Sequence, residues 1–362
     1  MGLRCARNFR GRMALASGSD SIHRGWLVKR ERLEQLFQAV EGSKSVLVLT
    51  HNDPDPDAIA SAVALRQLLA DTLGIESRIA YRGIIGRAEN KALVRYLDCS
   101  LRRFTSGHLN QSDAIALVDT QPEAGNNPLP ADHPPALVLD HHPWRDATAG
   151  AAFADVRPEL GSTSTMLVEY LRAAEIEPPA WLATALFYGI QTDTLGLVRG
   201  ASPDDVAAYF YLQPLVDVEA LVAIERAQVP IEYFQSLDAA LHSAHVYGNV
   251  ITSFVGRMRR PDLAAEMADL LLRLRGTHWA ICLGTYRDNL ILSVRARSGT
   301  SGAWQVAQAV VGEQGTAGGH GSMAGGQVPL RGADPEWLAA ELVERALLRL
   351  GVPPEGTAEP LL

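Results

Sequence analysis

The sequence is short of cysteine: its three thiols, Cys5, Cys99 and Cys282, lie far apart and form no CxxC pair. This spacing excludes zinc-ribbon and dithiol redox sites and argues against a disulfide framework, so we expect a protein of the reducing cytoplasm. Long apolar runs are also missing, since none approaches the roughly 20 residues that a membrane helix needs. We therefore expect no membrane partner.

Positive charge is scarce as well, because 33 basic residues stand against 41 acidic ones and give a formal net charge of −8. This balance argues against a protein that coats a long polyanion, although a local basic site can still bind a small one. The basic start of the chain lacks the apolar stretch of a signal peptide, and we interpret residues 1–28 as a disordered basic extension. A glycine fingerprint is absent after the first expected strand, which excludes a Rossmann-type nucleotide-binding protein.

What the sequence does have is an alternation of short apolar runs with helical patterns. In its first half, strands are expected at residues 46–50, 78–81, 114–118 and 136–139, and helices at 58–73, 89–97, 164–174 and 180–190. A second, smaller set of strands and helices follows from about residue 230. This alternation is typical of an open, mainly parallel α/β sheet.

The predicted fold class is therefore α/β, with an N-terminal doubly wound, mainly parallel sheet and a smaller C-terminal α/β domain. We expect the first domain to cover residues 29–202 and the second domain residues 231–352. Residues 203–230 are interpreted as a helical linker. Residues 353–362 are rich in proline, glycine and glutamate, and we interpret them as a disordered tail.

Acids and imidazoles follow three of the expected strands at the point where each strand ends. The first strand runs into His51-Asn52-Asp53-Pro54-Asp55-Pro56-Asp57, the third into Asp119, and the fourth into Asp140-His141-His142. Because the carboxyl ends of parallel strands line the ligand crevice of an open sheet, we expect these side chains to meet at one edge. The two prolines restrict the backbone between the acids, which points Asp55 and Asp57 the same way.

Helix capping and turn formation are the competing interpretation of these acids. We accept it for Asp53 but not for Asp55 and Asp57, because capping does not explain the imidazole of His51 on the same turn. A fourth acid, Asp193, follows an almost wholly apolar helical stretch, where a buried carboxylate needs a partner such as a metal ion. Several carboxylates mixed with two or three imidazoles suit Mn²⁺ better than Mg²⁺ or Zn²⁺.

Taken in order, H-x-x-x-D-x-D after a strand, a strand-end Asp, D-H-H and a later Asp resemble the DHH phosphoesterase superfamily. The resemblance covers about residues 44–330. The second region is similar to the DHH-associated C-terminal domain, whose glycine-rich signature stands here as Ala317-Gly318-Gly319-His320-Gly321. The chain departs from the family where Ala317 replaces a usual glycine. It looks most like the short two-domain oligoribonucleases and phosphoadenosine-phosphate phosphatases, the nano-RNase type.

The resemblance implies two divalent cations, which we expect to be Mn²⁺, with Mg²⁺ or Co²⁺ as alternatives. It assigns His51 and Asp55 to one ion, Asp57, His141 and Asp193 to the other, and Asp119 to both. It places Asp140 behind the ligands, where it orients the imidazoles, and turns His142 toward the substrate phosphate. Asp119, His141 and His142 are thus the implied catalytic group.

In the second domain, the resemblance implies that Arg295 clamps the terminal phosphate of the substrate. Two roles stay open for Arg297: a second residue that binds the phosphate, or a solvated strand residue. Gly318, Gly319 and His320 would line the same anion site, since glycines permit close approach of backbone amides. An active-site cleft is expected between this substrate-binding domain and the catalytic metal-binding domain.

The implied activity is Mn²⁺-dependent hydrolysis of short oligoribonucleotides, linear dinucleotides or 3′-phosphoadenosine 5′-phosphate, through a water shared by two cations. The net acidity favours a small substrate, because long single strands usually need a basic track with stacking aromatics. Three alternatives stay open: a cyclic-dinucleotide phosphodiesterase, an inorganic polyphosphatase or pyrophosphatase, and a catalytically silent nucleotide-binding regulatory module. We expect no obligatory protein partner, and a homodimer is left open.

Overall fold

The structure is a computed structural model that describes residues 30–297, 299–300, 302–353 and 358–362. The chain divides into two compact units. Unit 1 consists of the residues up to Arg82 together with Leu97–Asp217, and unit 2 of Gly83–Tyr96 together with Val218–Leu362. The expected basic extension, residues 1–28, lies outside the described residues.

Unit 1 is built on a six-stranded sheet in the order β3-β2-β1-β4-β5-β6, in which every pairing is parallel. Its strands are β1 (Ser45–Leu49), β2 (Glu76–Tyr81), β3 (Leu101–Arg103), β4 (Ala114–Val118), β5 (Leu137–Asp140) and β6 (Phe153–Val156). Strands β1, β4 and β5 are almost wholly buried, because a parallel sheet is covered on both faces. The chain order reverses between β1 and β4, where open α/β sheets bind their ligands.

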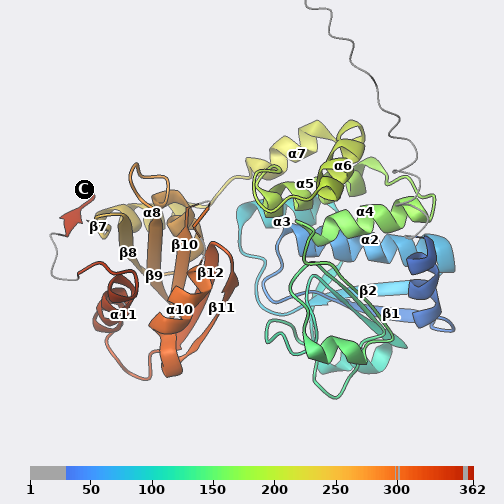
Figure 1. The fold of residues 1–362 in the computed structure, drawn as a ribbon, viewed down its shortest axis with the longest axis horizontal. Helices are drawn as coiled ribbons and strands as arrows, with labels where there is room; N and C mark the ends of the chain where they lie inside the picture. Colours follow the sequence, from blue (N-terminus) through green and yellow to red (C-terminus); the bar gives the residue numbers. More distant parts are fainter. Residues whose placement is uncertain (1–29, 298, 301, 354–357) are drawn as a thin grey trace, which may run out of the picture. The chain divides into compact units, whose positions relative to one another are not determined.

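Three helices of unit 1 pack against one another over the sheet: α2 (Pro56–Leu73), α4 (Thr163–Ala173) and α5 (Ala180–Thr194) (Figure 1). Proline in the first turn favours the start of α2, and Gly74, with φ of 65°, ends the helix in a left-handed conformation. Unit 1 also contains a helix over residues 30–39, α6 (Pro203–Leu212), and the 3₁₀ turns η1 (Ser106–Gln111), η2 (Asp146–Gly150) and η3 (Gln213–Leu215).

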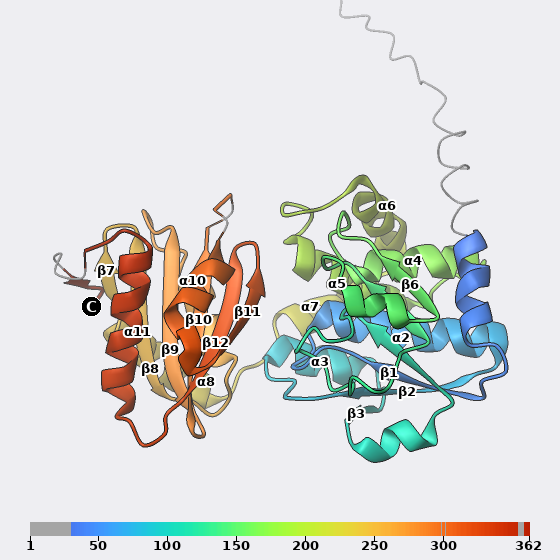
Figure 2. The same cartoon turned by 60° about the horizontal axis from the view of Figure 1, so that its bottom comes forward.

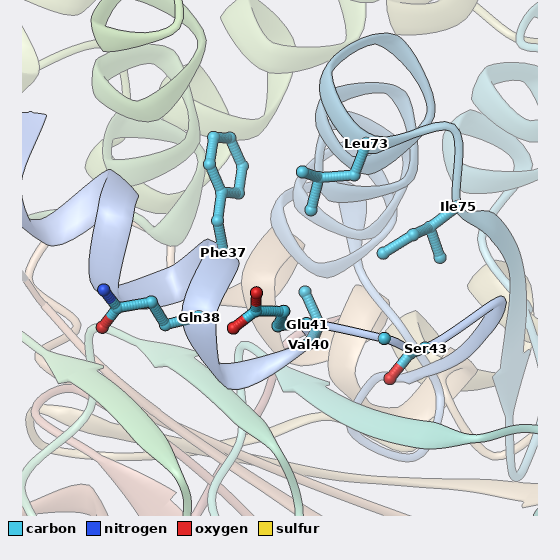
Figure 3. A pocket seen from close by; sticks show the side chains of 8 residues that line it. Phe37, Gln38, Val40, Glu41, Ser43, Leu73 and Ile75 are labelled. Atoms are coloured by element: carbon cyan, nitrogen blue, oxygen red, sulfur yellow. The ribbon is translucent and has the colours of Figure 1, made fainter.

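A hollow of about 370 Å³ opens where the helix over residues 30–39 ends beside the end of α2. Figure 3 shows Phe37 and Leu73 in its walls, with Glu41 and Ser43 nearby. None of the acids and imidazoles expected to bind metal lines this hollow. It is therefore separate from the candidate site described below.

Unit 2 carries a seven-stranded mixed sheet in the order β11-β12-β10-β9-β8-β7-β13. Its strands are β7 (His245–Tyr247), β8 (Val250–Arg257), β9 (Trp279–Tyr286), β10 (Asn289–Ala296), β11 (Thr316–His320), β12 (Met323–Pro329) and β13 (Glu359–Pro360). Only β8 and β9 pair in parallel, and the other pairings are antiparallel. The expected α/β fold class, with a parallel N-terminal sheet and a second sheet in the C-terminal region, is confirmed.

Helices cover both faces of this second sheet, each over its own core. α8 (Ile231–His242) and α9 (Leu263–Leu271) pack on one core, and α10 (Ala303–Val311) and α11 (Pro335–Arg349) on the other. Figure 2 shows α10 and α11 in front of the strands. Unit 2 also contains α3 (Ala88–Tyr96), which contacts α7 (Val218–Glu225), and the 3₁₀ turn η4 (Gly312–Gln314).

Two segments differ from the sequence-based expectations. The glycine-rich signature, where no strand was expected, forms the hairpin of β11 and β12. The tail expected to be disordered is partly paired: Glu359 and Pro360 form β13 beside β7, and the Leu361 N–H donates to Ala244 O at 2.9 Å. Leu361 also packs against the core under α8 and α9, which explains why a polar tail can be held there.

Within the described ranges, no single helix is long and apolar enough to cross a membrane. The segments Pro203–Leu215 and Val218–Glu225 meet the criteria of length and composition only when taken together as a bent pair.

Gly189 lets α5 approach the start of α2 and of α4 closely. A Cβ at this position would lie 3.2 Å from Asp57 Cα and would collide with Ser164 Oγ. Gly189→Ala should therefore destabilise the chain by about 1–3 kcal/mol through overpacking. In an exposed helix, the same change stabilises by about 1 kcal/mol. Urea unfolding of both proteins measures the difference.

The Ser164→Ala background supplies the matched control, because it removes the hydroxyl that the new methyl group meets. Gly189→Ala should cost less free energy of unfolding there than in the wild-type background. A gain in stability in the wild-type background would contradict the close packing.

Candidate metal centre

The segment after β1 turns sharply before α2 begins. Asp53 has a φ of 54°, as turn residues do, and Pro56 occupies the first turn of the helix. Asp55 is the N-cap of α2, since its Oδ1 accepts the Ala58 N–H at 3.0 Å. The same Oδ1 lies 3.6 Å from His51 Nε2, so capping the helix and facing the imidazole are roles of one atom and not alternatives.

Asp119 lies directly after β4 at the centre of the cluster. It is 1% exposed and has a φ of 59°, a left-handed conformation that strains a non-glycine residue and recurs at functional sites. Its Oδ2 lies 3.4 Å from His51 Nε2, and its Oδ1 lies 3.5 Å from His141 Nε2. The two oxygens of one carboxylate therefore face two different imidazoles.

His141 also faces Asp193, with 3.4 Å between Nε2 and Oδ2. Asp193 lies in the last turn of α5, and the structure thus brings α5 to the carboxyl edge of the sheet. Three groups have ligand atoms that all lie within 4.8 Å of one another: His51 with Asp55 and Asp119, Asp57 with His141 and Asp193, and Asp119 with His141 and His142.

Backbone carbonyls orient both of the inner imidazoles. The Nδ1 of His51 lies 2.8 Å from Asn52 O, and the Nδ1 of His141 lies 3.2 Å from Leu160 O. If each Nδ1 donates its hydrogen, the Nε2 lone pair is left to point into the cluster. His141 Nε2 is buried without a hydrogen-bond partner among the described residues. A cation is the partner that such a nitrogen lacks.

The N-terminus of α4 holds two of the acids. The N–H groups of Thr163 and Ser164 donate to Asp57 Oδ2 and Oδ1, both at 2.7 Å. The Thr163 hydroxyl donates to Asp119 Oδ1 at 2.9 Å. One residue therefore fixes an acid from α2 relative to an acid from β4, and the helix dipole favours the negative charge of Asp57.

Asp140 connects His142 to a buried glutamine. Its Oδ1 lies 2.8 Å from His142 Nδ1, and its Oδ2 accepts from Gln121 Nε2 at 2.7 Å. Burial opposes protonation of His142, but the hydrogen bond that it donates to Asp140 and the charge of Asp119 raise its pKa to about 9. Asp140 thus orients His142, whereas Leu160 orients His141.

The acids of the cluster repel one another. Burial, and then the charge of Asp119, raises the pKa of Asp57 to about 7. Burial, together with the charges of Asp55, Asp57 and Asp119, raises the pKa of Asp193 well above its usual value. Against the effect of burial, the charge of His51 lowers the pKa of Asp55. Buried charges of one sign are unstable unless an opposite charge compensates them.

The donor set consists of carboxylate oxygens and imidazole nitrogens, without a thiolate. Such a mixture suits Mn²⁺ and similar divalent ions. The converging acids, the partnerless nitrogen of His141 and the preset ring orientations therefore fit a divalent-cation centre. His51, Asp55, Asp57, Asp119, His141 and Asp193 would hold the ions.

The predicted substrate residues lie on and after β10 and on β11 of unit 2, two strands that β12 separates in the sheet. Arg295 on β10 is mostly buried, and its Nε donates to Asp269 Oδ1 at 2.7 Å, so a carboxylate already engages the guanidinium. Arg297 follows the end of β10 and is exposed. A Cβ at Gly319 would lie 2.5 Å from Ala324 Cα, whereas one at Gly318 would meet open space.

Gly319 is thus required by the hairpin itself, and Gly318 leaves backbone open to a ligand. The backbone of His320 pairs with Met323, and its side chain lies outside the described part of the structure.

Sequence reasoning missed Thr163, Ser164, Gln121 and Gly189. The run Ser162-Thr163-Ser164 before an apolar helix does predict an N-cap, and Ser162 Oγ accepts the Thr165 N–H. That signal places a helix start but says nothing about which acid lies opposite it. Gln121 and Gly189 carry no local signal at all.

Thr163→Val should weaken Mn²⁺ binding by about 10- to 100-fold, as the loss of outer hydrogen bonds to ligands does elsewhere. Valine keeps the shape and the N–H but loses the hydroxyl that positions Asp119. Isothermal titration calorimetry with Mn²⁺ measures the affinity without any substrate.

Thr163→Ser retains the hydroxyl and should bind nearly as the wild type does. Thr165→Val is the matched control, because its hydroxyl donates to Asp205 at 2.5 Å and to none of the metal-binding acids. Equal losses of affinity in the Thr163→Val and Thr165→Val variants would refute the positioning role of Thr163.

Part of the chain matches a known protein family. Residues 45–190 match the DHH family, N-terminal domain. An uncharacterized protein from Methanocaldococcus jannaschii is 35% identical over 324 residues, which are 88% of this chain and 66% of that protein. A probable manganese-dependent inorganic pyrophosphatase from Lactiplantibacillus plantarum is 29% identical over 176 residues, which are 48% of this chain and 56% of that protein. The chain thus spans only part of the length of these relatives.

A solved structure shows the same fold. The exopolyphosphatase-related protein from Bacteroides fragilis superposes with a TM-score of 0.70 at 16% identity, covering 88% of this chain and 96% of that one. The matched family range contains the ends of β1, β4 and β5, and with them every clustered side chain except Asp193. The family model and the order of the motifs agree: residues 45–190 of this chain form a DHH family N-terminal domain.

Proposed function

We propose that the chain is a metal-dependent phosphoesterase that takes two Mn²⁺ ions and hydrolyses short oligoribonucleotides, linear dinucleotides or 3′-phosphoadenosine 5′-phosphate. One observation carries the proposal: the two oxygens of Asp119 face two different imidazoles. On one side of Asp119 stand His51 and Asp55, and on the other stand His141, Asp57 and Asp193. This arrangement suits two cations that share one carboxylate.

When bound, such a pair of cations lowers the pKa of a water and neutralises charge on phosphoryl oxygens. The protein's own contribution is positioning. Thr163 and Ser164 hold the acids, Leu160 and Asn52 orient the imidazoles, and the close packing of Gly189 keeps α5 near Asp57. Preorganised groups need not reorganise when the substrate reacts.

His142 is proposed to contact the substrate. Its Nδ1 lies 2.8 Å from Asp140, and Gln121 holds the other oxygen of that carboxylate. In this orientation, Nε2 is the atom that would meet a phosphate oxygen. His142 is a third exposed at its side chain, whereas the side chain of His141 is only 10% exposed, which fits substrate contact for the first and ion binding for the second.

Unit 2 is proposed to be the substrate-binding domain. Gly318 offers open backbone on β11, and Arg295 and Arg297 supply positive charge on and after β10. Since Asp269 already pairs with Arg295, a substrate phosphate would have to exchange with that carboxylate or share the guanidinium with it.

Inorganic pyrophosphate is the second candidate substrate. A probable manganese-dependent inorganic pyrophosphatase resembles this chain over 176 residues. The glycine-rich hairpin favours nucleotide substrates over pyrophosphate, because it resembles the segment with which two-domain members of the DHH superfamily bind their substrates. A silent regulatory module is the weakest candidate, since competent side chains fill every proposed ligand position.

Asp119→Asn should reduce Mn²⁺-dependent hydrolysis by more than about 100-fold, because it removes the shared charge and not merely an outer hydrogen bond. Asparagine tolerates the left-handed backbone of this position, so the fold should survive. The measurement is initial rate on the dinucleotide pApA, 3′-phosphoadenosine 5′-phosphate, cyclic di-AMP and pyrophosphate, with thermal unfolding as a check of the fold.

Asp132→Ala, at an exposed acid in a loop of unit 1, is the control and should retain wild-type rates. Undiminished hydrolysis by the folded Asp119→Asn variant would refute the shared-carboxylate centre. If the wild type hydrolyses pyrophosphate and none of the nucleotides, pyrophosphate becomes the proposed substrate in their place.

A further inference from the structure

An exposed tryptophan follows the metal-binding imidazoles. Trp144 lies in the short loop Pro143-Trp144-Arg145, and 51% of its surface is exposed. No ring contact of this indole occurs among the described residues. An exposed indole offers a large aromatic face on which a ligand can stack.

The backbone on both sides of Trp144 is fixed by one buried side chain. Gln121, which is 1% exposed, donates from Nε2 to Pro143 O at 3.0 Å and accepts the Arg145 N–H on Oε1 at 2.9 Å. The Thr148 hydroxyl donates to the same Oε1 at 2.8 Å. The peptide groups flanking the indole are therefore held while the indole itself is left free, an arrangement that presents a rigid aromatic surface.

The backbone of this loop lies close to the metal centre. Trp144 is two residues after His142, so their Cα atoms are at most about 7 Å apart along an extended chain. His142 Nδ1 in turn lies 3.7 Å from Asp119 Oδ1. A nucleotide whose phosphate is near Asp119 therefore has its base within reach of the loop.

The charge of the loop matches the same kind of ligand. Arg145 is exposed, and within the described part of the chain its guanidinium forms no ion pair. An aromatic face next to a free cation fits a molecule that carries both an aromatic base and phosphates. Inorganic pyrophosphate has no aromatic face and would gain nothing from the indole.

We propose that Trp144 stacks on a base of the substrate and so selects nucleotides over inorganic phosphates. The inference rests on the proposed phosphoesterase function and narrows its substrate class. In it, Gln121 is the positioning residue that sets the backbone, and Trp144 is the residue that touches the substrate. The competing role for Trp144 is docking of another protein on the indole. That role predicts that loss of the indole affects KM no differently for substrates with and without bases.

The first test compares the dinucleotide pApA with its abasic analogue, which has the same phosphates and sugars but no bases. Trp144→Ala should raise KM for pApA by about 5- to 150-fold, the range that one base–aromatic stack contributes. KM for the abasic analogue should stay unchanged. Trp144→Phe, which keeps an aromatic face, should restore most of the affinity for pApA.

Trp337→Ala is the matched control, because it removes another exposed tryptophan, 64% exposed on α11 of unit 2. It should leave KM unchanged for both substrates. The stacking role would be overturned if Trp144→Ala raised KM equally for pApA and for the abasic analogue, or changed KM for neither.

The second test does not depend on turnover. Intrinsic fluorescence is titrated with AMP and with ribose 5-phosphate in EDTA, for the wild type, Trp144→Phe and Trp337→Phe. AMP should change the emission of the wild type and of Trp337→Phe but not that of Trp144→Phe, and ribose 5-phosphate should change none of them. An AMP response that persists in Trp144→Phe, or a wild type without any response, would overturn the inference.

The two proposals fail in different ways. If the wild type hydrolyses no phosphoester with Mn²⁺, the proposed function fails, and the AMP titration still reports on stacking. If hydrolysis of pApA proceeds and the AMP response does not depend on Trp144, the function stands and the stacking role is refuted.

Discussion

The mutual repulsion of buried carboxylates is the constraint on which this structure depends. Asp57, Asp119 and Asp193 converge at the carboxyl edge of a parallel sheet, and burial with the charge of Asp119 raises the pKa of Asp57 to about 7. Such a cluster opposes folding unless the chain or a cation compensates it. The amide groups at the start of α4 supply part of the compensation, and the divalent ions that the donor set fits would supply the rest.

This constraint explains why the surroundings of the site are so closely packed. Gly189 admits α5 against Asp57, and Thr163 ties the acid of α2 to the acid of β4 through one amide and one hydroxyl. Asp119 keeps a left-handed backbone that only surrounding contacts can maintain. The strained backbone and the repelling acids thus lower the stability locally. The same contacts hold the charges in a fixed arrangement, as preorganised sites require.

Much of the site was predictable because its residues follow strand ends. The apolar run of β1 and the acids after it predict both a buried parallel strand and its ligand edge. The short strands β3 and β6 were missed, since Leu-Arg-Arg has no apolar run and an acid interrupts Phe-Ala-Asp-Val. The hairpin of β11 and β12 was missed because glycine carries no strand signal, although Gly319 is required where the two strands approach each other.

The sequence by itself determined the α/β class, the order of the sheet-forming segments, and the identity of the acids and imidazoles, because these depend on local periodicity and on residue chemistry. Only the tertiary structure decided which atoms meet. It showed that Thr163 ties Asp57 to Asp119, that Leu160 orients His141, and that Gln121 fixes the loop of Trp144. These pairings join residues from separate strands and helices, and their partners are set by packing across the sheet edge, for which no local pattern exists.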